Sequence, residues 1–167
     1  MAFIPTDKSR AILLRKEDIF LKRRIVIRFN APVILSFALL SLLALVLGNL
    51  TNGATTYRYF SVYRSSLSDP LTYIRFFGHV LGHAGYDHYM GNMLLLLLVG
   101  PGIEEKYGHR TTALCIAVTA LVTGLVQFIF FPATALLGAS GIVFMMIVLS
   151  SFTEMGKEGI PITLILV

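Results

Sequence analysis

Long apolar stretches alternate with short polar segments along this chain of 167 residues. The first long stretch, residues 31–50, contains no charged residue, and it is long enough for one helix to cross a hydrocarbon core about 30 Å thick. Three more apolar stretches follow, and we expect them to form helices over about residues 86–105, 110–131 and 139–155. A further apolar segment begins at residue 160. The pattern predicts an all-α protein, a polytopic transmembrane helical bundle with about four complete spans and the start of a fifth.

The composition also indicates a membrane protein. Hydrophobic residues make up 56% of the chain and charged residues only 14%, and the mean hydropathy is +0.77. A soluble domain of this length needs a far more charged surface. The single cysteine, Cys115, lies in the middle of an apolar stretch, so we expect a packed thiol and no disulfide within the chain.

The last apolar segment, residues 160–167, is too short for a complete span. It supplies only about two helical turns. A helix that ended inside hydrocarbon would leave its last carbonyl groups without hydrogen bonds, at a cost of several kcal/mol for each group. We therefore expect the printed sequence to be part of a longer protein.

The basic residues predict the orientation in the membrane. Eight of the fourteen lie before the first expected span: Lys8, Arg10, Arg15, Lys16, Lys22, Arg23, Arg24 and Arg28. Lysine and arginine accumulate on the cytoplasmic side of membrane proteins, so we expect a cytoplasmic N-terminus. Residues 1–30 then form a basic, amphipathic cytoplasmic segment and residues 31–167 form a partial membrane core. The protein is expected to be an integral protein of the cell membrane.

The same placement explains the formal net charge of +5. Anionic lipid headgroups attract a basic segment that lies next to the membrane, so membrane lipids are expected partners. No motif that combines aromatic and basic residues accompanies the charge, and binding of nucleic acid is therefore not expected.

The segment between the first two expected spans, residues 51–77, is long for a loop in a compact membrane protein. Loops of this length commonly have structure of their own or a function. The segment is also rich in tyrosine and phenylalanine, which favour the interface between membrane and water. We expect it to lie half-embedded in the outer leaflet.

Polar residues stand directly before and inside the second expected span. His88 and Asn92 are four residues apart, so they share one face of a helix. His79 and His83 have the same spacing in the preceding segment. Polar side chains at this depth in a membrane are costly unless they are paired or hydrated, and they therefore indicate function by default.

Three interpretations of these polar residues are open. They can form hydrogen bonds between helices, and each such contact stabilises helix association by about 0.6–2 kcal/mol. They can bind zinc, but the motif His-Glu-x-x-His is absent and Asp87 is the one carboxylate nearby, so we expect no metal site. They can donate hydrogen bonds to a developing negative charge, which requires a nucleophile elsewhere in the chain.

A candidate nucleophile is Ser140, at the start of the fourth expected span. The neighbouring Gly138 and Gly141 allow the backbone and a substrate to approach closely, and a helix N-terminus favours an adjacent anion. The alternative is that these small residues form a packing surface between helices. The expected topology brings Ser140 to the same outer side of the membrane as His83 and His88.

Taken together, these motifs resemble those of the rhomboid intramembrane serine proteases. The pattern Gly-x-Ser-Gly opens one span, and the pattern His-x-x-x-x-His-x-x-x-Asn opens an earlier one. The matching residues are Gly138, Ser140 and Gly141 in the first pattern, His83, His88 and Asn92 in the second, and Glu104, Gly108, Arg75 and His79 at other positions of the family. The resemblance covers roughly residue 31 to the end of the chain. The combination is more specific than either motif alone.

The resemblance implies a six-helix core with a water-filled cavity that opens to the outside. It makes Ser140 the nucleophile, and it assigns the oxyanion hole to the side chains of His88 and Asn92 with the Ser140 backbone N–H. His83 is then a supporting residue near the mouth of the cavity. The implied substrates are transmembrane segments of other membrane proteins, cut near their outer ends, and no cofactor is implied.

Two positions differ from the family pattern. The family commonly has a tyrosine four residues after the serine, which stacks on the catalytic base. Phe144 stands at this position here, and it keeps the stacking surface but loses the hydroxyl group. Ile74 replaces a tryptophan before Arg75, which weakens an expected anchor of the first loop.

The general base is a third difference. Rhomboid proteases take it from a histidine in the sixth span, and the four histidines of this chain, His79, His83, His88 and His109, fit no such position. A serine without a base is a poor nucleophile, so we expect the base to lie beyond Val167 and the printed 167 residues alone to be inactive. A protease is the favoured hypothesis. The alternative is a non-catalytic rhomboid-like protein that binds transmembrane helices.

Overall fold

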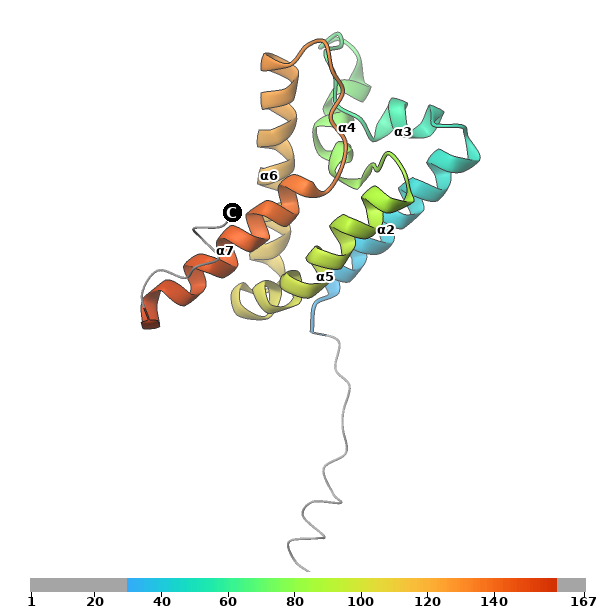
Figure 1. Ribbon diagram of the computed structural model, residues 1–167. Helices are drawn as coiled ribbons and strands as arrows, with labels where there is room; N and C mark the ends of the chain where they lie inside the picture. The colour runs from blue at the N-terminus through green and yellow to red at the C-terminus, as the bar shows by residue number, and fades with distance from the viewer. Residues whose placement is uncertain (1–29, 159–167) are drawn as a thin grey trace, which may run out of the picture.

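The computed structural model describes residues 30–158, with side chains described as far as residue 152. This part of the chain is mostly helical (Figure 1). Its helices are α2 (Pro32–Leu50), α3 (Ala54–Tyr59), α4 (Pro70–Gly78), the short 3₁₀ helix η1 (His79–Leu81), α5 (Tyr86–Tyr107), α6 (His109–Phe130) and α7 (Ser140–Glu158). The predicted all-α class is confirmed. The predicted amphipathic segment before residue 30 and the apolar segment from residue 160 lie outside the described residues.

Two of the helices in the described range, α2 and α6, are long and apolar enough to cross a membrane. α5 has the required length, but polar and charged residues lie at both of its ends. The apolar part of α7, Ser140–Phe152, is shorter than a full span. Of the four predicted complete spans, two therefore meet the criteria of length and hydropathy.

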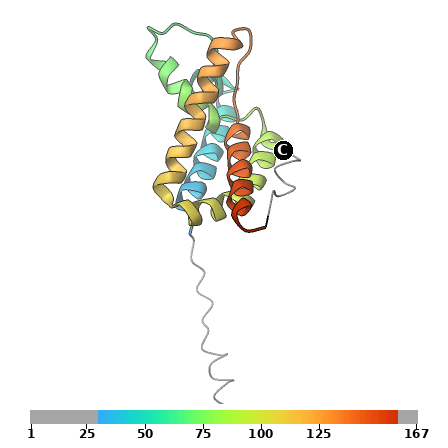
Figure 2. The same cartoon turned by 90° about the vertical axis from the view of Figure 1, so that its left-hand side faces the viewer.

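The four long helices lie side by side (Figure 2). α5 packs against both α2 and α7, and α6 packs against α5 and α7. Buried apolar side chains fill the space between the helices, including Ile34, Leu96, Ile142 and Met146. Gly100 allows α5 to approach α2 closely, because a Cβ atom at this position would lie 2.8 Å from Cδ1 of Ile34.

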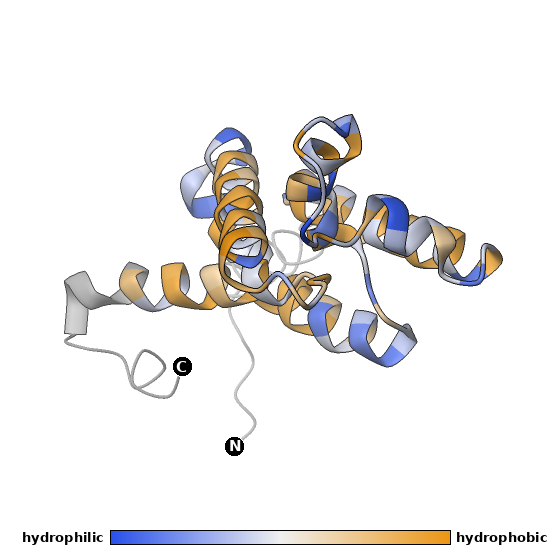
Figure 3. Ribbon diagram, turned by 90° about the horizontal axis from the view of Figure 1, so that it is seen from above, coloured by the Kyte–Doolittle hydropathy of each residue, from blue (hydrophilic) through white to orange (hydrophobic). Residues whose placement is uncertain are grey.

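Large apolar side chains also cover the outside of the bundle. Leu39, Leu43, Leu98, Leu114 and Phe130 are each more than half exposed. Soluble proteins avoid apolar surfaces of this extent, whereas helices that face lipid require them. Seen from above, the helices are mostly hydrophobic, and the hydrophilic residues gather at helix ends and in the connections (Figure 3).

The segment between α2 and η1 has structure of its own, as the length of residues 51–77 predicted. It contains α3 and α4. Its backbone also pairs with the segment before α7, where Val62 and Leu136 exchange two N–H to C=O hydrogen bonds of 2.9 Å. The predicted location of this segment in the outer leaflet stays a prediction.

Arg75 in α4 holds this segment together. Its side chain is buried, and its Nε donates a hydrogen bond of 2.9 Å to the Arg58 carbonyl. One terminal nitrogen forms an ion pair of 3.2 Å with Asp69, which also caps α4 by accepting from the Leu71 N–H. The guanidinium lies over the Tyr63 ring, 4.7 Å from its centroid. These contacts fix α4 relative to α3.

Glu104 joins three helices at the opposite end of the bundle. Its buried carboxylate accepts hydrogen bonds from the N–H groups of Val33 and Ile34, both at 2.9 Å. These groups belong to the first turn of α2, where N–H groups have no partner within the helix. His109, at the start of α6, donates to the same carboxylate at 2.6 Å. One side chain thus connects the start of α2, the end of α5 and the start of α6.

Candidate active site

Ser140 is the first residue of α7, and it is exposed. The Val143 N–H begins the hydrogen-bond pattern of this helix by donating to the Ala139 carbonyl at 2.9 Å. The N–H groups of residues 140–142 precede this pattern, so they have no partners within the helix. The turn before Ser140 depends on Gly138, whose φ of +123° lies in the region that favours glycine.

His88, in the first turn of α5, lies against this turn. A Cβ atom on Gly138 would lie 2.7 Å from Cε1 and 2.8 Å from Nε2 of His88, so only glycine leaves room for the ring. The Ala84 N–H donates to Nδ1 of His88 at 3.4 Å. Because Nδ1 is the acceptor, Nε2 carries the proton in the neutral ring. An N–H donor therefore stands beside the turn that leads to Ser140.

Asn92 lies one turn further along α5 and is 7% exposed. Its Nδ2 donates to the His88 carbonyl at 2.9 Å, so one of its two amide hydrogens is used within the helix. The second hydrogen is left for another acceptor. The structure thus brings His88, Asn92 and Ser140 to the adjoining ends of α5 and α7. Their roles in an oxyanion hole stay predictions.

His83 is buried between η1 and α5. Its Nδ1 donates to the Leu81 carbonyl at 3.2 Å, which leaves Nε2 as an acceptor without a partner among the described residues. The ring meets those of His88 and Tyr89 edge to face, at centroid distances of 5.1 and 5.4 Å. Burial lowers the pKa of His83 to about 4, so the ring is neutral at neutral pH. No cluster of three metal-ligating side chains forms among the described residues.

Two more of the predicted residues flank Ser140 in α7. Phe144 lies one turn after Ser140 and is 55% exposed, so its ring borders the same open face of the helix. Gly141 lies against α6, because a Cβ atom there would be 3.3 Å from Cγ2 of Thr123. The two interpretations of this small-residue stretch are therefore compatible, since Gly141 packs between helices while Ser140 is exposed.

His79 has a structural contact with the site that sequence reasoning missed. Its carbonyl accepts from the Gly138 N–H at 2.9 Å, so it holds the turn before Ser140. Its buried ring donates from Nδ1 to the Arg75 carbonyl at 3.1 Å, and Nε2 lies 3.2 Å from Oγ1 of Thr123. The spacing of polar residues marked His79 as notable, but its partners come from segments that are far apart in the sequence.

Gln127 in α6 was also missed. Its Nε2 lies within hydrogen-bond distance of the Phe131 carbonyl, at 3.2 Å, and of the carbonyl and hydroxyl oxygens of Thr134, at 3.0 and 2.9 Å. These bonds shape the connection from α6 to the turn before Ser140. The available signal was a single amide side chain in an otherwise apolar stretch.

Comparison with known proteins places the chain in a family. A family model described as the Rhomboid domain matches residues 70–163, which is more than half of the chain. The chain belongs to the rhomboid family, as the motifs predicted. A similar protein, "Rhomboid-related protein 2" of Mus musculus, is 34% identical over 83 residues. The match covers 45% of this chain and 28% of that protein, so the chain spans little more than a quarter of the relative's length. Family and apolar helices together indicate a membrane protein.

Proposed function

We propose that the full protein is an intramembrane serine endopeptidase, a hydrolase that cuts transmembrane segments of membrane-protein substrates near the outer face of the bilayer. The observation that carries the proposal is the exposed Ser140 at the start of α7, with the His88 ring against the turn before it. Packing alone requires neither an exposed hydroxyl group nor a histidine N–H at this turn. Membership of the rhomboid family supports the same activity.

In the proposed reaction, Oγ of Ser140 attacks the carbonyl carbon of the scissile peptide bond while the general base takes the hydroxyl proton, which it later gives, as general acid, to the leaving amine. We assign three donors to the negative charge that develops on the carbonyl oxygen: the Ser140 N–H, the Nε2–H of His88 and the second amide hydrogen of Asn92. The peptide C–N bond then breaks, the amine leaves with a proton from the general acid, and water hydrolyses the acyl-enzyme.

The general base in this proposal is a histidine beyond Val167, as the family resemblance implies. The histidines of the printed chain have other contacts. His79 and His83 donate from Nδ1 to backbone carbonyls, His88 lies on the donor side of the site, and His109 pairs with a glutamate at the opposite end. The printed chain alone is therefore proposed to be inactive.

We further propose that α2, α5, α6 and α7 all cross the cell membrane, with the N-terminus in the cytoplasm. The end with Ser140 then faces the outside, and the end with Glu104 faces the cytoplasm. α5 and α7 are less apolar than α2 and α6. This difference is consistent with their role, because helices that line a hydrated cavity carry polar residues.

Fluorophosphonate labelling of the full protein in membranes tests this proposal. The probe reacts with an activated serine hydroxyl, so we expect it to label Ser140 and to block cleavage of a transmembrane reporter substrate. Ser140→Ala is expected to lose both labelling and cleavage, whereas Ser150→Ala, a matched change in the same helix, is expected to keep them. If the unaltered protein shows neither labelling nor cleavage, a non-catalytic rhomboid-like protein that binds transmembrane helices becomes the better hypothesis. Labelling of the 167-residue chain alone would contradict the need for a base beyond it.

A further inference from the structure

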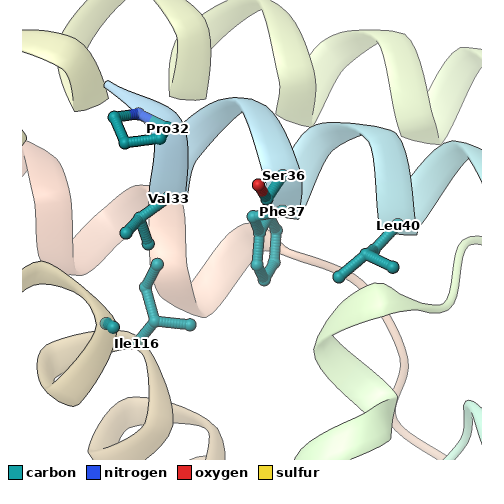
Figure 4. Close-up of a pocket in the computed structure, with 7 residues that line it drawn as sticks. Pro32, Val33, Ser36, Phe37, Leu40 and Ile116 are labelled. Carbon is teal, nitrogen blue, oxygen red and sulfur yellow. The ribbon is translucent and has the colours of Figure 1, made fainter. Parts of the chain in front are cut away.

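A groove runs along the outside of the bundle between α2 and α6, with a volume of about 350 Å³. Val33, Phe37 and Leu40 line it on α2, and Ala113 and Ile116 line it on α6 (Figure 4). Its walls are mostly apolar, and Ser36 on α2 is the one polar side chain that lines it. The groove exists because α2 packs closely against α5 but makes few contacts with α6. Empty space of this kind forfeits dispersion contacts unless another molecule fills it.

The groove has the direction and the length of a lipid tail. α2 and α6 both begin at the end of the bundle that carries Glu104, and the lining of α2 extends from its first residue, Pro32, to Leu40. This distance corresponds to a rise of about 12 Å. One leaflet of the hydrocarbon core is roughly 15 Å thick. In the proposed orientation, on which this inference rests, the groove therefore extends from the cytoplasmic surface almost to the middle of the bilayer.

A positive side chain lies at the cytoplasmic end of the groove. Arg110 precedes Ala113 by three residues, so both lie on the same side of α6. Arg110 is exposed and forms no ion pair with a described residue. Arginine binds phosphate through two parallel hydrogen bonds, so the charge at this end matches an anionic headgroup.

We propose that the groove between α2 and α6 binds one acyl chain of an anionic phospholipid from the cytoplasmic leaflet, and that Arg110 binds its phosphate group. The apolar walls provide shape but no selectivity, because bulk lipid tails are equally apolar. The preference for an anionic headgroup comes from Arg110. The bound chain supplies the contacts that α2 and α6 do not make with each other.

Photo-crosslinking in vesicles tests this site. The full protein is reconstituted with traces of phosphatidylglycerol or phosphatidylcholine that carry a diazirine in the acyl chain, and the crosslinked residues are mapped. We expect crosslinks at Phe37 and Ile116, and about five times more with phosphatidylglycerol, the factor expected for one arginine at an anionic surface. Arg110→Gln is expected to keep the crosslinks and to remove most of the preference.

Filling the groove gives a second, independent test. Ala113→Phe places a ring in the groove and is expected to abolish the crosslinks at Phe37. Leu114→Phe is the matched control, because Leu114 is 63% exposed and does not line the groove. Equal crosslinking in Ala113→Phe and the unaltered protein would overturn the proposal, as would equal crosslinking by the two lipids.

Two further measurements separate this proposal from the others. A photoreactive amino acid at Phe37 that crosslinks to residues 1–29 would show that the N-terminal segment fills the groove, and the lipid site would be wrong. Protease accessibility of the N-terminus in sealed cells checks the orientation by itself. All lipid experiments are repeated with Ser140→Ala protein, so failure of the lipid site is distinguishable from failure of the protease.

Discussion

The two ends of the helix bundle both contain buried polar groups, but they differ in how these groups are paired. At the first end, the Glu104 carboxylate accepts from Val33, Ile34 and His109. The start of α2 thereby gains acceptors for N–H groups that a helix leaves unpaired. Both carboxylate oxygens have partners, as expected of a network that stabilises a fold. Among the described residues at this end, the buried hydroxyl group of Thr112 is the one side-chain group without a hydrogen-bond partner.

The end of the bundle with Ser140 contains hydrogen-bond donors and acceptors that have no partner in the described part of the chain. The first N–H groups of α7 beside Ser140 precede its helical pattern, the Nε2–H of His88 lies against the Gly138 turn, and Nε2 of His83 has no partner among the described residues. Unused donors and acceptors are unfavourable for stability alone. The polar groups at the Glu104 end therefore support the helices, whereas those at the Ser140 end are available to a ligand.

The largest expected effect on stability is that of Glu104→Ala. The change leaves two backbone N–H groups without their acceptor, at about 1–3 kcal/mol for each group, so we expect the free energy of unfolding to fall by about 2–5 kcal/mol. His109→Gln should cost less than about 1 kcal/mol, because the His109 side chain is 59% exposed. Unfolding in detergent micelles measures both. Ser140→Ala is the control, because it changes an exposed residue and should alter the free energy of unfolding by no more than about 0.5 kcal/mol. If Glu104→Ala lowers this free energy by no more than Ser140→Ala does, Glu104 does not have the stabilising role assigned to it.

Asn92→Ala tests the oxyanion assignment in the full protein. If the side chain is one of several donors, its removal should lower kcat/KM by the equivalent of about 2–4 kcal/mol. Cleavage kinetics with a transmembrane reporter substrate provide the measurement. Unchanged turnover in both Asn92→Ala and His88→Ala would show that these side chains do not bind the oxyanion.

Gly138→Ala should disturb the contact between α5 and the turn before Ser140. The new Cβ atom would meet the His88 ring at 2.7 Å, and alanine is strained at a φ of +123°. We expect a loss of about 1–3 kcal/mol in unfolding free energy, together with weaker labelling of Ser140. Gly102→Ala in α5 is the matched control, since nothing lies within 4 Å of a Cβ atom there and helix propensity favours alanine. Equal effects of the two changes would argue against the close contact.

The smallest expected effect is a pH dependence from His83. Its folded pKa of about 4 lies below the ordinary value of 6.5, so the unfolded chain takes up a proton more readily. The contribution to stability is therefore complete above pH 6.5 and is lost as the pH falls toward 4, with on the order of 1 kcal/mol lost between pH 7 and 6. His83→Gln should flatten the unfolding free energy in this range relative to the unaltered protein. If the unfolding free energies of His83→Gln and the unaltered protein change with pH in the same way, His83 is not buried in its neutral form.

The positions of the long helices were largely predictable, because their signals are local. α2 begins with Pro32, a residue suited to the first turn of a helix. The predicted interval 86–105 agrees closely with α5, Tyr86–Tyr107, which is flanked by Gly85 and Gly108. Apolar runs and glycines are visible without knowledge of any contact.

The helices within residues 51–77 could not be located in advance. Their arrangement depends on the Arg75 side chain, which reaches the Arg58 carbonyl and the Asp69 carboxylate. The pairing of Val62 with the segment before α7 likewise joins residues that are remote in the sequence. Such contacts form only after the helices have packed, and no local pattern encodes them.

Composition and spacing along the chain were sufficient to predict the helical class, the membrane character and the residue types that can perform the chemistry. The contacts of those residues became visible only in the folded protein. It placed the His88 ring against Gly138 and bound the start of α2 to Glu104. Hydrogen bonds and close packing tolerate errors of only a few tenths of an ångström, and residues far apart in the chain are positioned that accurately only by the packing of whole helices.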